Sequence, residues 1–277
     1  AIASQEAGQA LAEALNTNTV LKELDVSDNM QKDYSGCIVG GTGPGFAKKL
    51  AVGVSANRTL TSLNISNNTL THGKLLQKQT YDYEGDPVDE AVYETDVSGV
   101  VALADSIKNN SALTSLNVSN NSLWENWSFS SGQWWVNGGY PPGYPEGDCK
   151  EKPHTTNQGF FALCDAIKTN GALVKLNMSK NRIKGAEAGK ALSDALAANK
   201  VLEELDLSEN YSGPEFAKEF AVGLGANGAM VSANLLNNNM GTEQANKLVT
   251  MLKEHPTLKS LCGNKGDENV LDMSGKK

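Results

Sequence analysis

The sequence has few residues of the kinds that build metal, redox and membrane-spanning sites. Among its 277 residues there are three histidines and four cysteines, and the cysteines form no C-x-x-C pair and no zinc-binding spacing. No apolar run approaches the roughly 20 residues that cross a bilayer. We therefore expect a protein without a metal ion, a cofactor or a membrane span.

An excess of basic residues is also missing. Lys and Arg number 24 against 32 Asp and Glu, which gives a formal net charge of −8. Nucleic-acid affinity depends largely on clustered Lys and Arg, so this balance argues against a nucleic-acid partner. Hydrophobic residues make up 39% of the chain, enough for a soluble protein to bury a substantial core.

The cysteines and histidines lack the surroundings that catalysis needs. Cys164 lies in an apolar helical stretch, which predicts a buried, inert thiol. Cys37 and Cys149 lie in irregular segments and can form a disulfide only if those segments meet, so the sequence leaves their pairing open. His72 and His154 have no metal spacing or nucleophile motif beside them. We therefore expect no enzymatic activity.

A motif of the form L-x-x-L-x-L-x-x-N recurs along the chain. Its copies are "VLKELDVSDN", "TLTSLNISNN", "ALTSLNVSNN", "ALVKLNMSKN", "VLEELDLSEN" and "AMVSANLLNN", and "TLKSLCGNKG" is a decayed seventh copy. A fixed repeat of this length is typical of solenoid proteins, in which each repeat is one structural unit. The second apolar position of the copies falls at Leu24, Leu63, Leu116, Leu176, Leu205, Ala233 and Leu261.

A helical segment precedes each copy of the motif. Its apolar residues stand four positions apart, as do Leu11 and Leu15 or Leu192 and Leu196, so each helix has one apolar face. This combination resembles the leucine-rich-repeat family, and in particular its ribonuclease-inhibitor-like class, because the last three intervals between copies are 29, 28 and 28 residues. The resemblance implies one α/β domain over residues 1–277, a right-handed horseshoe-shaped solenoid of about seven repeats. Its parallel strands would line the concave face and its helices the convex face.

Two sets of asparagines recur in register with the repeat. The motif asparagine is expected to bond backbone groups that the turn leaves unpaired, and a second asparagine closes each helix. His255 takes the place of that second asparagine in the last repeat, which predicts a structural role for it. The motif asparagines are Asn29, Asn68, Asn121, Asn181, Asn210 and Asn238, and the helix-closing ones are Asn18, Asn57, Asn110, Asn170, Asn199 and Asn227.

The first three repeats are longer than the others. The intervals from Leu24 to Leu63, to Leu116 and to Leu176 are 39, 53 and 60 residues, or roughly 10, 25 and 31 more than a regular repeat. We place the insertions at about residues 31–43, 71–97 and 124–156. All three enter between the motif asparagine and the next helix, so they are expected to leave the solenoid along one edge, which is often the binding face.

The third insertion contains every tryptophan of the chain, and the second is acidic and rich in tyrosine. The second insertion is expected to form a hairpin about residues 85–87. Four exposed tryptophans would leave much apolar area in water, so either the third insertion packs on itself or over the solenoid edge, or some of its rings form a platform for a partner. The candidate binding residues are Trp124, Trp127, Trp134, Trp135, Tyr140, Tyr144, Tyr81 and Tyr83.

The concave face is expected to be small, polar and repetitive. One row of its residues is Asp or Asn in six copies, and we expect this row to be solvated or satisfied within itself rather than a specific site. The row consists of Asp25, Asn64, Asn117, Asn177, Asp206 and Asn234.

These patterns favour a non-catalytic scaffold that presents an edge of inserted loops, and its concave face, to a protein partner. A carbohydrate-binding module that uses the Trp- and Tyr-rich loop is an alternative. A regulator of small GTPases is another, implied only by the resemblance, since some ribonuclease-inhibitor-like solenoids act on these enzymes. The chain starts without Met and ends on "VLDMSGKK", which resembles the start of another strand, so it is also interpreted as a segment of a larger chain or assembly. Sequons inside expected strands weakly favour an intracellular setting.

Overall fold

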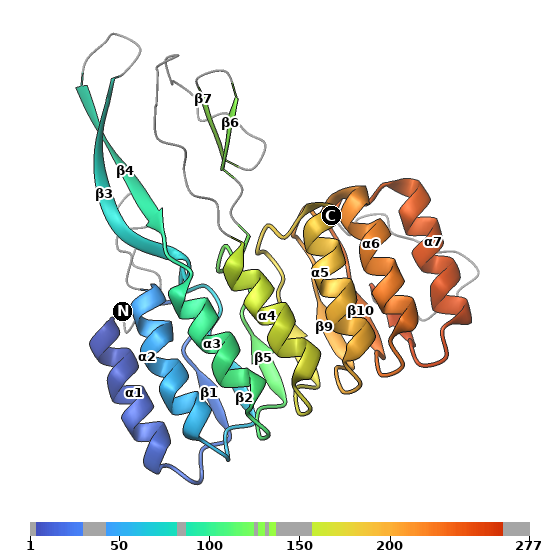
Figure 1. Cartoon of the computed structure of the whole chain (residues 1–277), viewed down its shortest axis with the longest axis horizontal. Helices are drawn as coiled ribbons and strands as arrows, with labels where there is room; N and C mark the ends of the chain where they lie inside the picture. Colours follow the sequence, from blue (N-terminus) through green and yellow to red (C-terminus); the bar gives the residue numbers. More distant parts are fainter. Residues whose placement is uncertain are drawn as a thin grey trace.

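A computed structural model of the chain describes the backbone of residues 4–29, 43–81, 87–124, 127–130, 133–136 and 157–262, and their side chains outside residues 72–94 and 127–136. Helices and short strands alternate along the chain and form a curved solenoid with strands on one face and helices on the other (Figure 1). The helices are α1 (Gln5–Thr17), α2 (Gly43–Ala56), α3 (Ser98–Lys108), α4 (Gln158–Thr169), α5 (Gly185–Ala198), α6 (Gly213–Ala226) and α7 (Gly241–Glu254).

The sheet of the solenoid is parallel throughout, in the order β1-β2-β5-β8-β9-β10-β11. Equivalent residues of the motif lie opposite one another, so that Leu63 pairs with Leu116 and Leu176 with Leu205. We call a helix together with the solenoid strand that follows it a coil, numbered 1 to 7 from the N-terminus. The strands are β1 (Glu23–Asp25), β2 (Ser62–Asn64), β5 (Ser115–Asn117), β8 (Lys175–Asn177), β9 (Glu204–Asp206), β10 (Ser232–Asn234) and β11 (Ser260–Leu261). The fold class expected from the sequence is confirmed.

The core lies between the sheet and the helices. Leucines of the strand motif and residues four apart on each helix meet there, and Leu63, Leu103 and Leu192 are fully buried. Helices pack closely where one of them carries a glycine. A Cβ atom on Gly223 of α6 would overlap the backbone of Ser193 in α5, so a larger residue cannot be accommodated without moving the helices apart.

The motif asparagines form a continuous buried ladder, as predicted. The backbone N–H of Asn121 donates to Asn181 Oδ1 (2.7 Å), and the backbone N–H of Asn181 donates to Asn210 Oδ1 (2.7 Å). The Nδ2 of Asn181 donates to the carbonyl oxygens of Val118 in the preceding coil and Met178 in its own. Each amide therefore satisfies backbone groups of adjacent coils and fixes their separation.

The helix-closing asparagines form a second ladder. Asn199 Nδ2 donates to the carbonyl oxygens of Ile167 and Asn170 in coil 4, while its Oδ1 accepts the backbone N–H groups of Val201 and Leu202. Asn57, Asn110, Asn170 and Asn227 repeat this pattern, so the ends of coils 2 to 6 are each tied to the preceding helix end.

His255 takes this role in coil 7, which confirms the structural interpretation. Its Nδ1 accepts the backbone N–H of Leu258 (2.9 Å), and its Nε2 lies 3.0 Å from the carbonyl oxygen of Leu224. Because Nδ1 is the acceptor, the ring has its proton on Nε2 and donates it to Leu224.

The replacement His255→Asn is expected to preserve folding stability within about 1 kcal/mol, since asparagine makes the same bonds in the other coils. In contrast, His255→Ala should lower the free energy of unfolding by about 2 kcal/mol, because it leaves the backbone N–H of Leu258 unpaired and removes one of the two donors to Leu224 O. Urea unfolding of both variants checks the difference. Equal stability of the two variants would contradict the structural role.

Candidate partner-binding edge

Two hairpins extend from one edge of the solenoid, the edge at which the helices begin (Figure 1). The first, β3 (His72–Tyr81) and β4 (Pro87–Thr95), lies between β2 and α3 in the chain; the second, β6 (Trp127–Ser130) and β7 (Gln133–Val136), lies between β5 and α4. We call this side the insertion edge and define it by residues 95–98, 122–124, 157–158, 184–187 and 211–215. Of the first insertion, residues 31–42 lie outside the described residues, and Gly43 already begins α2.

The β3–β4 hairpin confirms the antiparallel ribbon expected in the acidic insertion, but its turn comes earlier than expected, because Pro87 already pairs in β4. Its register runs from His72 opposite Thr95 to Tyr81 opposite Pro87, so the connection spans residues 82–86. Tyr81 is the last residue of β3, and Tyr83 lies outside the described residues. Residues 72–96 contain seven Asp and Glu but only two Lys. The hairpin therefore adds a strongly acidic projection to the insertion edge.

Trp124 is part of the solenoid core. Its side chain is 4% exposed, and its ring packs edge-on against Phe160 and Phe161 of α4, with centroids 5.5 and 5.8 Å away. Such contacts stabilise the fold in addition to the burial of apolar area. For Trp124 the packed interpretation thus holds, and the ring does not belong to an exposed platform.

The remaining aromatic candidates differ in how far the structure describes them. Trp127 begins β6, and Trp134 and Trp135 lie in β7, where they pair with Phe129 and Ser128. The side chains of these tryptophans lie outside the described part. Tyr140, Tyr144 and the cysteines of the open disulfide question, Cys37 and Cys149, also lie outside it.

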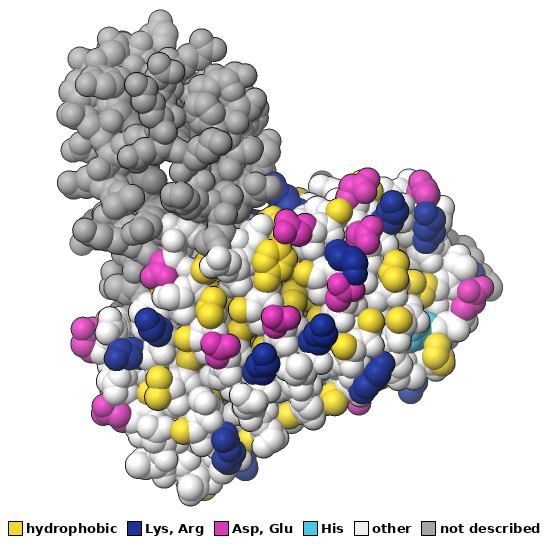
Figure 2. All heavy atoms as spheres, in the orientation of Figure 1, with side chains coloured by type: hydrophobic (Ala, Val, Ile, Leu, Met, Phe, Trp, Pro, Cys, Tyr) yellow, Lys and Arg dark blue, Asp and Glu magenta, His cyan; other side chains and the backbone are white. Residues whose placement is uncertain are grey.

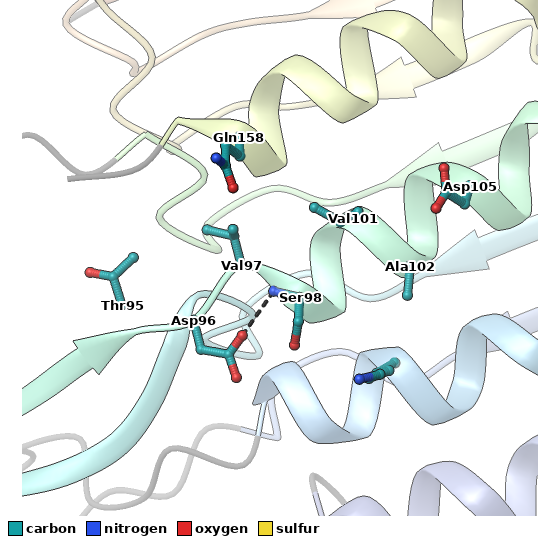
Figure 3. Close-up of a pocket in the computed structure, with 9 residues that line it drawn as sticks. Thr95, Asp96, Val97, Ser98, Val101, Ala102, Asp105 and Gln158 are labelled. Atoms are coloured by element: carbon teal, nitrogen blue, oxygen red, sulfur yellow. Dashed lines mark hydrogen bonds between the residues drawn. The ribbon is translucent and has the colours of Figure 1, made fainter. Parts of the chain in front are cut away.

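A hollow of about 640 Å³ lies at the base of the β3–β4 hairpin (Figure 3). Val97, Val101 and Ala102 of α3 and its entry form an apolar part of its lining, and Gln158 of α4 lies across from them. The carboxylate of Asp96 accepts the backbone N–H of Ser98 (2.8 Å), which fixes the first turn of α3. The hollow is large enough for several side chains of a partner.

A second hollow of about 390 Å³ lies at the starts of α5 and α6. Trp124, Lys184 and Tyr211 contribute to its lining. Tyr211 is 63% exposed and has a left-handed backbone conformation with φ of 56°. Burial lowers the pKa of Lys184, and repulsion from Arg182 lowers it further. Because Trp124 belongs to the core, the third insertion begins after it and not at residue 124. Trp124 and Gln158 thus lie on either side of the inserted segment and contribute to one hollow each.

Sequence reasoning did not select Tyr211, although it is a large exposed aromatic at the insertion edge. It directly follows the motif asparagine Asn210, the point at which the insertions enter other repeats. Its position directly after the motif asparagine would have identified Tyr211 from the sequence, whereas a search for clustered aromatic residues does not.

On the concave face, the predicted row of Asp and Asn makes local bonds, and one bond along the row joins Asn64 Nδ2 to Asp25 of the neighbouring strand. The side chain of Asn177 accepts the backbone N–H of Ser179 (2.9 Å), and five equivalent residues of the row make the same local bond. In the neighbouring row, Lys175 pairs with Glu204 at 2.9 Å. Across the helical face, charges of both signs are mixed (Figure 2). The helical face shown there therefore has no single dominant charge among the described residues.

Groups with catalytic potential are sparse in the described residues. No three His, Cys, Asp or Glu side chains there lie close enough together to hold a metal ion. Cys164 is buried in α4, and burial raises the pKa of its thiol far above the usual range, so the inert thiol is confirmed. Within the same residues, no helix combines the length and hydrophobicity needed to cross a bilayer.

Comparison with known proteins agrees with the coils. A family model described as "Leucine Rich repeat" matches residues 56–72, from the end of α2 into β3. Together with the seven coils and their asparagine ladders, this match supports a leucine-rich-repeat solenoid. A search of curated proteins gives no match.

The solved structures similar to this chain include one leucine-rich repeat-containing protein. The tropomodulin C-terminal domain of Caenorhabditis elegans is 12% identical, with a TM-score of 0.41 over 60% of this chain and 81% of that one. The leucine-rich repeat-containing protein LegL7 of Legionella pneumophila is 14% identical, with a TM-score of 0.40 over 91% and 70%. The actin-binding site 2 of leiomodin-1 is 20% identical, with a TM-score of 0.35 over 38% of this chain; the match spans 62% of that structure's length.

Proposed function

We propose that this protein is a non-catalytic interaction scaffold that binds a protein partner along its insertion edge. The observation that carries the proposal is the position of the two hairpins, which extend from one edge of the solenoid (Figure 1). Both hollows lie along the same edge. Loops held by a rigid frame are frequent binding elements, because the frame positions them at little entropic cost.

The ribonuclease-inhibitor-like class is supported by the regular 28- and 29-residue intervals of the later coils. In this proposal the concave face is a secondary surface. Each Asn or Asp of its row accepts a local backbone N–H, whereas Tyr211 presents an aromatic ring to solvent beside a hollow.

The test compares partner capture by the full chain with capture by a variant in which a short Gly-Ser linker replaces residues 125–156. Trp124 stays in place because it belongs to the core. We expect the variant to remain folded and to lose the partner. A matched control is Val222→Ala on the helical face, where the side chain is exposed and away from the insertion edge. Loss of the same partner on charge reversal at Glu204, with binding retained by the loop-deleted variant, would instead assign recognition to the concave face.

Once a partner is isolated, Tyr211→Asn is expected to weaken its binding about tenfold, since exposed aromatic residues are frequent binding anchors. Asparagine tolerates the left-handed backbone conformation at this position, so the melting temperature should not fall. Isothermal titration calorimetry and a thermal scan measure the two quantities. Binding of glycans that is lost on Trp134→Ala or Trp135→Ala would replace the protein partner with the carbohydrate alternative.

A further inference from the structure

The β3–β4 hairpin is built from much longer strands than the solenoid. Its strands have 10 and 9 residues, whereas the solenoid strands have two or three (Figure 1). An uninterrupted antiparallel register runs from Leu75 opposite Tyr93 to Tyr81 opposite Pro87. Among the described strands, β3 and β4 pair only with each other. Each of them therefore has one edge that can accept a further strand.

The base of the hairpin is fixed to the solenoid. Thr71, directly before β3, is 1% exposed, and its hydroxyl lies within hydrogen-bonding distance of the carbonyl oxygens of Asn121 (3.2 Å) and Ser122 (3.1 Å). The backbone N–H of Asp96, directly after β4, donates to Thr71 O (2.9 Å). A ribbon anchored in this way loses less freedom when another strand pairs with it, which lowers the entropic cost of binding.

The edge of β4 is less protected against pairing than the edge of β3. Proteins commonly protect open edges with proline, lysine or a bulge. The irregularity in the register of this hairpin lies at its base, between His72 and Leu75, and Pro87 is the first residue of β4. Residues 88–95 contain neither proline nor lysine. A two-stranded ribbon is only marginally stable by itself, so a third strand along this edge would stabilise it.

The charges of the two strands specify what kind of strand would fit. β4 contains Asp89, Glu90 and Glu94 and no Lys or Arg, while β3 contains two lysines and no Asp or Glu. In the register of the hairpin, Lys78 lies opposite Glu90. Opposite charges on neighbouring strands are favourable, and like charges are unfavourable. A basic strand therefore suits the free edge of β4, whereas the β4 strand of a second copy of this chain would place acidic residues against acidic residues.

We propose that the free edge of β4 binds an extended segment of the protein partner that contains Lys or Arg, as the third strand of the ribbon. The backbone of residues 88–95 supplies the N–H and C=O groups of the new ladder, and the acidic residues of β4 select a basic strand. This inference rests on the proposed function, because the hairpin extends from the insertion edge, and it adds the chemistry of the partner segment.

The probe is a synthetic peptide with the sequence of β3, "HGKLLQKQTY", which already matches β4 in length and charge. Hydrogen exchange of the full chain is measured with and without millimolar peptide. We expect the amides of alternate β4 residues to exchange about fivefold more slowly with the peptide, because alternate residues of an edge strand direct their N–H groups toward its open side. Alternation distinguishes strand pairing from a contact made by side chains alone.

Two altered peptides separate the backbone ladder from the charge preference. N-methylation of the central amides removes backbone donors but keeps the side chains, and Lys74→Glu with Lys78→Glu in the peptide reverses its charge. Each change should weaken binding about tenfold. In the full chain, Glu90→Lys with Glu94→Lys should reverse the preference, so that the glutamate peptide binds more tightly than the lysine peptide. The melting temperature of the solenoid should stay the same, because β4 is not part of its sheet.

Unchanged exchange of the β4 amides, or equal binding of the lysine and glutamate peptides, overturns the proposal. A dimer of the chain that protects β4 without any peptide would assign the edge to a second copy and overturn it as well. If β4 stays unprotected while partner capture still requires residues 125–156, strand addition alone is wrong and the proposed function stands. Protection of β4 by the peptide, with partner capture that depends on Glu204 and not on residues 125–156, would support strand addition and contradict the proposed function.

Discussion

Asn181→Ala is expected to lower the free energy of unfolding by about 4 kcal/mol. The side chain is fully buried at the centre of the motif ladder, where it joins coils 3, 4 and 5. Alanine would leave the backbone N–H of Asn121 unpaired in the interior, at about 1 to 3 kcal/mol. It would also remove one of the two amide donors from each of the carbonyl oxygens of Val118 and Met178, at about 1 kcal/mol each. Urea denaturation followed by far-ultraviolet circular dichroism measures the loss.

The matched control for this variant is Asn177→Ala, on the concave face of the same coil. Asn177 accepts one local bond from Ser179 and is partly exposed, so its loss should cost about 1 kcal/mol or less. Asn181→Asp gives a further check, because a carboxylate can accept the N–H of Asn121 but cannot donate to Val118 O or Met178 O. If Asn181→Ala and Asn177→Ala proved equally mild, the ladder would not hold the coils together.

Gly223→Ala is expected to destabilise the protein by about 2 to 3 kcal/mol. The added Cβ atom would overlap backbone atoms of Ser193, so α5 and α6 must separate and lose packing along their length. Gly225, two residues further along the same helix, meets only the flexible end of Met251 at 3.4 Å. Gly225→Ala should therefore raise stability by about 0.5 kcal/mol, since alanine favours the helix over glycine.

Thermal unfolding of the two glycine variants measures the expected loss of stability at Gly223 and the expected gain at Gly225 with one method. The pair shares its chemical change and its helix, so a difference between the variants reports the packing of α5 on α6. A loss at Gly225 equal to that at Gly223 would show instead that glycine is needed in α6 for a reason other than helix contact.

The repeating parts of the fold follow from the sequence because each coil buries the same positions. The motif leucines, the helix residues four apart and the asparagines all have periodic partners, and even the exchange of Asn for His255 preserves the pattern of bonds. Periodicity therefore predicts the sheet order and the location of the core.

The contacts of the candidate site could not be predicted from the repeat, because the inserted segments have no equivalent in the other coils. Composition grouped Trp124 with the other tryptophans, but its ring belongs to the last buried position before the third insertion, against Phe160 and Phe161. Tyr211 was missed for the opposite reason. It lies in a regular coil, where nothing in its composition distinguishes it from a turn residue.

The position at which insertions enter the coils has a consequence for how such a protein can change. Strands separated by 53 or 60 residues in the chain keep the same pairing as strands separated by 28. The entropy of closing a longer loop grows only with the logarithm of its length, about 0.6 kcal/mol for each doubling. Evolution can therefore lengthen, shorten or exchange these inserted segments at a small cost in folding stability. A protein of this kind can gain new binding partners while the spacing of its coils stays the same.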